Sequence, residues 1–212
     1  MNQILERIKK TGIIPVVVIE DKKDAEPLAE ALCKGGLPCA EVTFRTAAAA
    51  EAIQLMKNAH PEMLVGAGTV LTIDQVDTAI AAGAEFIVSP GFDSVIVDYC
   101  LEKGIVVLPG CISPSEAAIA VRKGLSVIKF FPAEQAGGLP FIKAIAAPYT
   151  TLSFMPTGGI NPENVKEYLK YDRIFACGGS WMVKAKLISE GRFDEIQKLT
   201  EEAAAIVKEI RG

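Results

Sequence analysis

Lys129 is flanked on both sides by apolar side chains, an unusual setting for a charged group. It lies within the run 126–133, which reads SVIKFFPA. Because burial removes the water that solvates an ammonium group, such a setting favours the neutral amine. A neutral, oriented amine attacks ketones and aldehydes to form Schiff bases. The same pattern fits a lysine whose charged end reaches the surface from a half-buried strand, so the surrounding sequence must decide.

A second group of polar side chains alternates with apolar ones along one predicted strand. Residues two apart on a strand point to the same face, so Glu41, Thr43 and Arg45 share one face. Val42 and Phe44 share the other face and are expected to pack against helices. A surface antiparallel strand could show the same alternation. In a parallel strand covered on both sides, however, the polar triplet points into the interior.

The same alternation places Val127, Lys129 and Phe131 on one face, while Ile128 and Phe130 occupy the other. If the latter pair packs on helices, the lysine points inward. Active sites of β/α barrels lie at the C-terminal ends of the strands. Both Lys129 and Arg45 fall near such ends, so we expect them at one site.

Two glycine pairs indicate a second kind of site. Gly158–Gly159 and Gly178–Gly179 follow the last two apolar segments, and the second pair continues into Ser180. One such pair indicates only a tight turn. Phosphate sites in barrels are commonly built from the loops after strands 7 and 8, where glycines let backbone N–H groups approach the anion. An earlier segment, 66–69, either keeps the barrel mouth open or lets Thr69 bind a ligand carboxylate.

Eight apolar segments alternate with helical patterns from end to end. They lie near residues 13–19, 38–45, 63–69, 85–89, 105–109, 125–131, 152–157 and 173–178. Gly83, Gly104 and Gly124 suit the left-handed position that ends a helix, and a strand pattern follows each of them. One extra helix precedes the first strand, and a long helix is predicted near 193–210.

Eight βα units predict a single-domain (β/α)8 TIM barrel over residues 1–212, with an extra N-terminal helix. An open doubly wound sheet is the alternative. No linker or change in composition marks a second domain. At 212 residues and 50% hydrophobic content, the chain is large enough to bury a full core.

Composition argues against several other classes of protein. The net charge of −4 and the isoelectric point near 5.2 give no support to nucleic-acid binding. No apolar stretch reaches membrane-spanning length. The five cysteines are dispersed and lack metal-ligand spacing, so we expect reduced thiols, a cytoplasmic protein and no metal site. The single histidine, His60, lies in a predicted turn, which leaves acid–base chemistry to carboxylates, lysine and hydroxyls.

The motifs resemble those of the class I 2-keto-3-deoxy-6-phosphogluconate (KDPG) aldolases, also called 4-hydroxy-2-oxoglutarate (KHG) aldolases. The resemblance covers nearly the whole chain in order. It is carried by EVTFRT at 41–46, GAGTV at 66–70, KFFPAE at 129–134, PTGGI at 156–160 and GGSW at 178–181. Segment 13–19 lacks an arginine. In this respect the chain resembles the phosphogluconate branch more than the related phosphogalactonate aldolases.

The resemblance implies a lyase that uses no cofactor and no metal. It implies cleavage of 2-dehydro-3-deoxy-6-phosphogluconate to pyruvate and glyceraldehyde 3-phosphate in the Entner–Doudoroff pathway, and of 4-hydroxy-2-oxoglutarate to pyruvate and glyoxylate. It also implies a homotrimeric barrel.

Carried over by motif, Lys129 is the Schiff-base lysine and Glu41 the general acid and base. Arg45 and Thr69 hold the keto-acid carboxylate, and Thr157 lies near the substrate hydroxyls. The predicted phosphate ligands are Gly158, Gly159, Gly179 and Ser180.

Two other functions remain open on the residues alone. A phosphosugar epimerase or isomerase on the same barrel would share the phosphate loops but would need no lysine nucleophile. A non-catalytic barrel that serves as a scaffold would leave Lys129 and Glu41 without a purpose. Reaction with pyruvate and borohydride, which traps a Schiff base on lysine, distinguishes the three.

Overall fold

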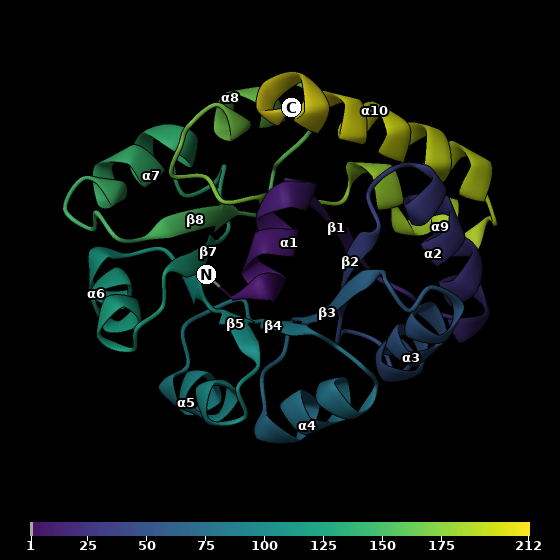
Figure 1. The fold of residues 1–212 in the computed structure, drawn as a ribbon, viewed down its shortest axis with the longest axis horizontal. Coiled ribbons are helices and arrows are strands. Elements are labelled where there is room, and N and C mark those ends of the chain that lie inside the picture. The colour runs from purple at the N-terminus through teal and green to yellow at the C-terminus, as the bar shows by residue number, and fades with distance from the viewer. Residues whose placement is uncertain (1) are drawn as a thin grey trace.

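The computed structural model describes residues 2–212, which form a ring of helices around a curled parallel sheet (Figure 1). The strands are β1 (Ile13–Val17), β2 (Cys39–Thr43), β3 (Leu64–Gly68), β4 (Phe86–Val88), β5 (Val106–Leu108), β6 (Gly110–Cys111), β7 (Val127–Phe130), β8 (Ser153–Pro156) and β9 (Cys177–Gly179). The helices before β6 are α1 (Gln3–Thr11), the 3-10 helix η1 (Lys22–Asp24), α2 (Ala25–Lys34), α3 (Ala49–Ala59), α4 (Ile73–Ala81) and α5 (Ser94–Glu102). Those after it are α6 (Pro114–Arg122), α7 (Gly138–Ala146), α8 (Val165–Leu169), η2 (Trp181–Val183), α9 (Ala185–Ser189) and α10 (Phe193–Arg211).

The helix ends follow the local sequence. Gly83, Gly104 and Gly124 all have positive φ, as the helix-ending pattern predicted. The Ser113 side chain accepts from the Glu116 backbone N–H, and the Glu116 carboxylate accepts from the Ser113 N–H. This capping box satisfies donors that the first turn of α6 leaves free.

All strand pairs are parallel, but the strands form two sheets. Six strands pair in the order β5-β4-β3-β2-β1-β9, and the others pair in the order β6-β7-β8. Between β8 and the β9 segment there are only isolated bridges, Phe154 with Ile174 and Thr157 with Gly178. The parallel α/β architecture agrees with the prediction, whereas residues 2–212 do not show the eight uninterrupted strands of a complete barrel.

Two of the predicted strands differ from those observed. The segment expected at 105–109 is shortened to β5, which ends before Pro109, a residue with no N–H to donate to a neighbouring strand. The chain continues as the unpredicted short strand β6, which pairs with β7. The Pro109 carbonyl still accepts from the Lys129 N–H at 3.0 Å. The last strand begins at Cys177 rather than near 173, because residues 173–175 touch β8 only around Phe154.

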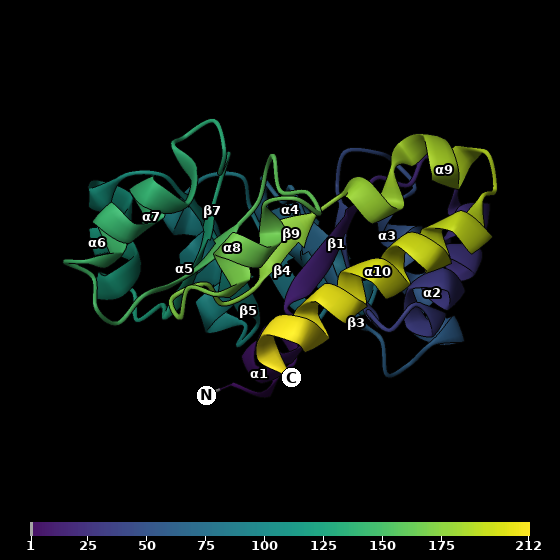
Figure 2. The same cartoon turned by 90° about the horizontal axis from the view of Figure 1, so that it is seen from above.

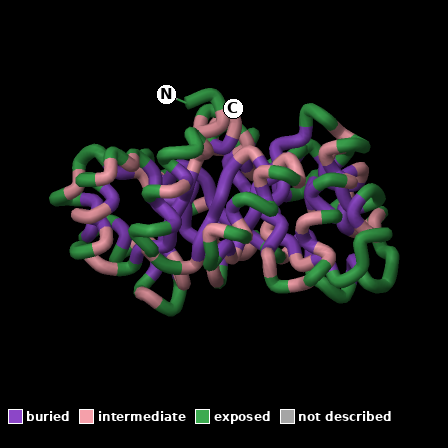
Figure 3. The backbone as a smooth tube through the Cα atoms, turned by 90° about the horizontal axis from the view of Figure 1, so that it is seen from below, coloured by how far each residue is buried: buried purple, intermediate pink, exposed green. Residues whose placement is uncertain are grey.

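The core lies on both faces of the sheet, and the buried strands occupy the centre of the molecule (Figure 3). The interior of the ring is filled by strand side chains that include Phe86 and Met155, and by Ile8 from α1. Gly66 makes room for this packing, since a Cβ there would lie 2.3 Å from the Phe86 ring. Helix α1 therefore covers the end of the ring where the strands begin, and the opposite end is left for a site.

Candidate active site

Lys129 and Glu41 come from strands of the two different sheets and meet inside the ring. Lys129 lies on β7 and Glu41 on β2, and 88 residues separate them in the sequence. The Lys129 Nζ donates to Glu41 Oε1 at 3.3 Å, and the two side chains are only 6% and 1% exposed. Both side chains point inward, the orientation that the strand alternation predicted.

This ion pair is incompletely satisfied. Two charges removed from water lose hydration, and a buried pair recovers that loss only when its other polar atoms are also hydrogen-bonded. Within residues 2–212, Glu41 Oε2 is buried and has no hydrogen-bond partner. The Lys129 Nζ lies 5.1 Å from the centre of the Phe131 ring. The pair thus keeps an acceptor oxygen available beside an amine, an arrangement suited to proton transfer near a nucleophile.

Gly68 on β3 makes room for the carboxylate. A Cβ at this position would lie 2.3 Å from Glu41 Oε1 and 2.7 Å from Glu41 Cγ. Thr43, which shares the inward face of β2, donates its hydroxyl to the Val17 carbonyl at 2.9 Å. Thr43 therefore links β2 to β1 and belongs to the framework of the site.

Arg45 and Thr69 are brought together where β2 and β3 end. The Arg45 Nε donates to Thr69 Oγ1 at 3.3 Å, and the arginine is exposed. Thr69 has a φ of 56°, and among residues 2–212 it is the only residue other than glycine with positive φ. A β-branched residue in this conformation costs about 1–3 kcal/mol and is characteristic of functional positions.

The glycine loops line a cavity of about 420 Å³. The loops after β8 and β9 stand at the end of the ring opposite α1 (Figure 2). The predicted residues that line this cavity are Arg45, Thr157, Gly158, Gly159, Gly179 and Ser180. Lys129, Glu41 and Thr69 do not line it. Phe131 joins the two parts, because its ring faces the Lys129 amine and it also lines the cavity.

The carbonyls of the loop after β8 are held by the neighbouring loop and by two asparagines. The Thr157 carbonyl accepts from the Ala133 N–H at 2.8 Å, and the Gly158 carbonyl accepts from the Glu134 N–H at 3.1 Å. The Gly159 carbonyl accepts from the side-chain amides of two residues, Asn161 at 3.3 Å and Asn164 at 3.0 Å.

The N–H groups of the same loop are free. In residues 2–212, those of Gly158, Gly159 and Ile160 donate to no protein acceptor. The two glycines have φ values of 99° and 80°. Consecutive free backbone N–H groups at a cavity are a binding arrangement for anions.

Thr157 directly precedes the first glycine pair and lines the same cavity. It is 7% exposed, and within residues 2–212 its Oγ1 has no hydrogen-bond partner. Gly178 makes room for it, because a Cβ there would lie 2.3 Å from Thr157 Oγ1. The hydroxyl is therefore kept free next to the cavity, which suits a contact with a polar ligand.

Sequence reasoning missed three polar side chains of this region. Asn161 and Asn164 hold the Gly159 carbonyl, and Lys184 lines the cavity. The Asn161-Pro162 pair could be recognised as a helix-start signal, but a contact with a carbonyl two residues back gives no distinct pattern. Lys184 sits four residues after Ser180, and that proximity to the second glycine pair was the available signal.

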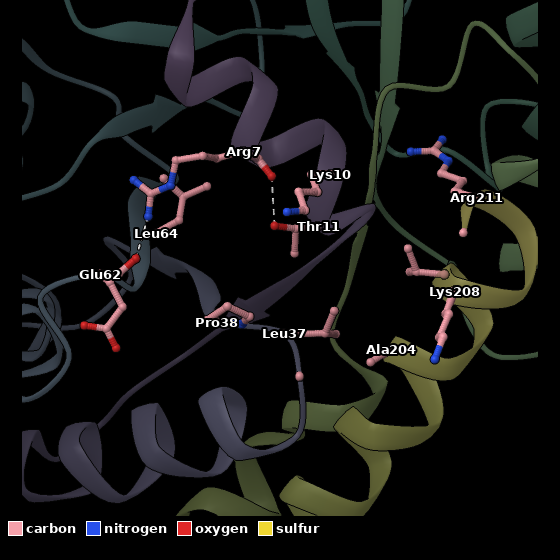
Figure 4. A pocket seen from close by; sticks show the side chains of 13 residues that line it. Arg7, Lys10, Thr11, Leu37, Pro38, Glu62, Leu64, Ala204, Lys208 and Arg211 are labelled. Atoms are coloured by element: carbon pink, nitrogen blue, oxygen red, sulfur yellow. Dashed lines mark hydrogen bonds between the residues drawn. The ribbon is translucent and has the colours of Figure 1, made fainter.

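A larger cavity, of about 600 Å³, lies at the α1 end of the ring (Figure 4). Its arginines already have structural partners. Arg7 pairs with Glu85 at 2.7 Å and donates to the Glu62 carbonyl at 2.6 Å, and Arg211 donates to the Phe175 carbonyl at 2.8 Å. At this face of a barrel, such contacts serve stability.

Within residues 2–212 there is no group of three or more histidine, cysteine, aspartate or glutamate side chains that could hold a metal ion. None of the helices in that range combines the length and the apolar character needed to cross a membrane.

Comparison with known proteins points to one family. The family model for KDPG and KHG aldolase matches residues 4–199. The 2-dehydro-3-deoxy-phosphogluconate aldolase of Treponema pallidum is 48% identical over 207 residues, which cover 98% of this chain and 99% of the relative.

Two solved structures have similar folds. The 2-keto-3-deoxy-6-phosphogluconate aldolase of Zymomonas mobilis with 3-phosphoglycerate has a TM-score of 0.90 and 41% identity, over 97% of each chain. The KDPG aldolase of Legionella pneumophila, with pyruvate captured as a covalent carbinolamine intermediate, has a TM-score of 0.91 and 40% identity, over 94% of this chain and 97% of that chain. The match to the family model, the sequence identity and the coverage together show that this chain belongs to the KDPG and KHG aldolase family.

Proposed function

We propose that this protein is a class I aldolase. It cleaves 2-dehydro-3-deoxy-6-phosphogluconate to pyruvate and glyceraldehyde 3-phosphate, and 4-hydroxy-2-oxoglutarate to pyruvate and glyoxylate. The observation that carries the proposal is the buried contact of 3.3 Å between the Lys129 amine and the Glu41 carboxylate. The family supports it, since its Legionella member was captured with pyruvate as a carbinolamine.

The same contact weighs against the two alternatives. An epimerase or isomerase needs the phosphate loops but has no use for a buried amine nucleophile. In a scaffold protein, a buried ion pair gives no advantage over two well-packed apolar residues. An incompletely satisfied pair costs free energy, so a function that uses both groups accounts for it better.

The reaction begins when the Glu41 carboxylate takes a proton from the Lys129 ammonium. The neutral amine that results attacks the C2 ketone of the substrate. The product is a carbinolamine, which loses water to become a cationic imine. Glu41 transfers the protons needed to form the carbinolamine and to expel its hydroxyl as water. The imine then acts as the electron sink for the next step.

Glu41 next takes the proton from the C4 hydroxyl. The C3–C4 bond breaks, its electron pair moves into the imine to give an enamine, and the aldehyde product leaves. The enamine is protonated at C3 to restore the imine, and water hydrolyses it to release pyruvate and Lys129. Because the imine itself accepts the electron pair, the sequence of steps requires no metal or organic cofactor.

The rest of the site holds the two ends of the substrate. Arg45 and Thr69 bind the keto-acid carboxylate, for which the fork of a guanidinium is well shaped. The free N–H groups near Gly158 and Gly159 bind the phosphate, together with the backbone of Gly179 and the hydroxyl of Ser180. The unpartnered Thr157 hydroxyl lies between these ends and contacts the substrate hydroxyls.

We also propose that residues 1–212 form one domain, in which the two sheets complete a (β/α)8 barrel. The bridges between β8 and the β9 segment, and the continuity of β5 with β6 through Pro109, support this closure. The five free cysteines suit the reducing cytoplasm, where we place the protein.

A homotrimer is the proposed assembly. Large apolar side chains are exposed in the segments that follow β3, β4 and β6, with Leu71 at 55%, Val95 at 63% and Ile112 at 38%. Exposed apolar surface of this kind suits contact with a second copy of the chain. Sedimentation equilibrium measures the mass in solution, and a monomer at micromolar concentration would contradict the assignment.

The function is tested by trapping the imine. The protein is mixed with pyruvate and borohydride, digested and analysed by mass spectrometry, and we expect reductive modification of Lys129. Lys129→Ala should lose both labelling and turnover. Lys198→Ala, which removes an exposed lysine of α10, is the matched control and should be labelled like the wild type. Labelling of Lys129→Ala to the wild-type extent would refute the assignment of Lys129 as the nucleophile.

The role of Glu41 is tested separately. Glu41→Gln keeps the shape of the side chain but cannot accept a proton. We expect kcat to fall about 10²- to 10⁴-fold, the usual contribution of general acid–base catalysis. Imine formation with pyruvate, followed by single-turnover borohydride trapping, should slow as well. Normal turnover of the variant would remove Glu41 from the mechanism.

A further inference from the structure

Lys184 lines the cavity of the glycine loops without having a partner of its own. It follows η2 and directly precedes α9, and its side chain is exposed. Its carbonyl accepts from the Leu187 N–H at 2.9 Å and from the Ile188 N–H at 3.3 Å. Within residues 2–212, its ammonium takes part in no ion pair. The backbone of Lys184 is thus held by hydrogen bonds, while its ammonium is left without a carboxylate partner in residues 2–212.

The neighbouring lysine, Lys186 on the short helix α9, differs in this respect. Lys186 pairs with Glu190 at 3.8 Å and does not line the cavity. The two lysines lie two residues apart and both are exposed, so they form a matched pair: one lines the cavity and one does not.

The charge balance of the cavity makes the unpaired ammonium significant. Among residues 2–212, the ionisable side chains that line the cavity are Arg45 and Lys184, and no carboxylate of that range lines it. Arg45 contacts Thr69 at the ends of β2 and β3. Lys184 is therefore the cation on the side of the cavity formed by Ser180 and the second glycine pair.

The turn between Ser180 and Lys184 keeps these two residues on the same rim. The Val183 N–H donates to the Ser180 carbonyl at 3.1 Å. Gly179 lies against the Trp181 ring, since a Cβ there would be 2.0 Å from the ring, which ties the start of the turn to β9. The flexible part of Lys184 is its side chain, which can reach an anion held by the glycine loops.

We propose that Lys184 binds the phosphate group of the substrate and determines the preference for phosphorylated over unphosphorylated substrates, an inference that rests on the proposed aldolase function. The free N–H groups of the loop after β8 give a phosphate directed hydrogen bonds, and the ammonium balances its charge. 4-Hydroxy-2-oxoglutarate ends one carbon after the C4 that is cleaved and carries no phosphate. Lys184 therefore strengthens the binding of the phosphorylated substrate far more than that of 4-hydroxy-2-oxoglutarate.

The first test compares Lys184→Gln with Lys186→Gln on both substrates. For Lys184→Gln we expect the ratio of kcat/KM for the phosphorylated substrate to that for 4-hydroxy-2-oxoglutarate to fall about 10-fold, as for the loss of one charge-assisted hydrogen bond. The change should appear mainly in KM, shrink at high salt and be largely restored in Lys184→Arg. Lys186→Gln should keep the wild-type ratio.

The second test measures binding without turnover. Inorganic phosphate is titrated into the wild type and both glutamine variants by calorimetry, and only Lys184→Gln should bind it more weakly. An unchanged substrate ratio together with unchanged phosphate binding would overturn the proposal, as would equal losses on both substrates. A wild type that turns over neither substrate would refute the aldolase function instead, and the phosphate titration would still decide the role of Lys184.

Discussion

Replacing Gly68 by alanine tests whether the position of the Glu41 carboxylate, and not merely its presence, controls the reaction. A Cβ at Gly68 would lie 2.3 Å from Glu41 Oε1, whereas ordinary contact begins at about 3.4 Å. The new methyl has little freedom to move, because β3 is paired with β2 and β4 and all of its residues are buried. The carboxylate must therefore move by about 1 Å, away from the contact with Lys129.

The expected effects follow from that displacement. A misplacement of about 1 Å in a catalytic group can lower the rate about 10²-fold. Overpacking of a buried position usually costs about 1–3 kcal/mol of folding free energy. We therefore expect Gly68→Ala to remain folded at room temperature, with a lower midpoint in urea, and to show kcat near that of Glu41→Gln. Because Lys129 itself is untouched, borohydride trapping with pyruvate should slow without disappearing.

The control is Gly91→Ala in the loop after β4. A Cβ at Gly91 has no atom within 4 Å, and its φ lies outside the range that favours glycine. That variant should match the wild type in both stability and kcat. Stability is measured by urea denaturation, and rates by coupling pyruvate release to lactate dehydrogenase. A Gly68→Ala enzyme with wild-type kcat would show that the reaction tolerates a displaced carboxylate, and the reasoning would fail.

Two further predictions concern the carboxylate end of the substrate and the thiols. Arg45→Lys should lower kcat/KM for both substrates to a similar degree, because they share the keto-acid end and an ammonium cannot form the paired contacts of a guanidinium; unchanged steady-state kinetics would remove Arg45 from the site. Burial raises the pKa of Cys33 and Cys100 to about 11 and that of Cys111 to about 12. At about pH 8 roughly one in a thousand of the first two thiols is ionised, so Ellman's reagent should label the native protein slowly and the guanidinium-unfolded protein fast. Rapid labelling of the folded protein would contradict this.

Much of the site was accessible from the sequence because strand geometry is simple. The alternation around Lys129 and Glu41 fixes the face of each side chain once the strand is recognised as buried on both sides. The parallel order of the strands then brings their C-terminal ends to one rim. Two residues 88 positions apart could therefore be placed in one interior by local patterns alone.

Other features depend on contacts that local patterns do not contain. The strand pattern at 105–109 includes Pro109, but the missing N–H ends β5 at Leu108, and the chain continues as β6 in the other sheet. The sequence predicts that the glycine pair at 158–159 belongs to a phosphate site. The hydrogen bonds that fix its carbonyls come from Ala133, Glu134 and the two asparagines, and only the folded chain brings these donors to the loop.

The glycines next to the reactive groups connect the fold to the chemistry. The two buried side-chain oxygens without a partner in residues 2–212 belong to Glu41 and Thr157. Each of these side chains lies against a glycine, Gly68 and Gly178 respectively, and a Cβ on either glycine would come within 2.3 Å of it. An unsatisfied buried polar group costs about 1–3 kcal/mol. The fold thus gives up stability at two points, and a substrate that hydrogen-bonds to both oxygens recovers that free energy when it binds.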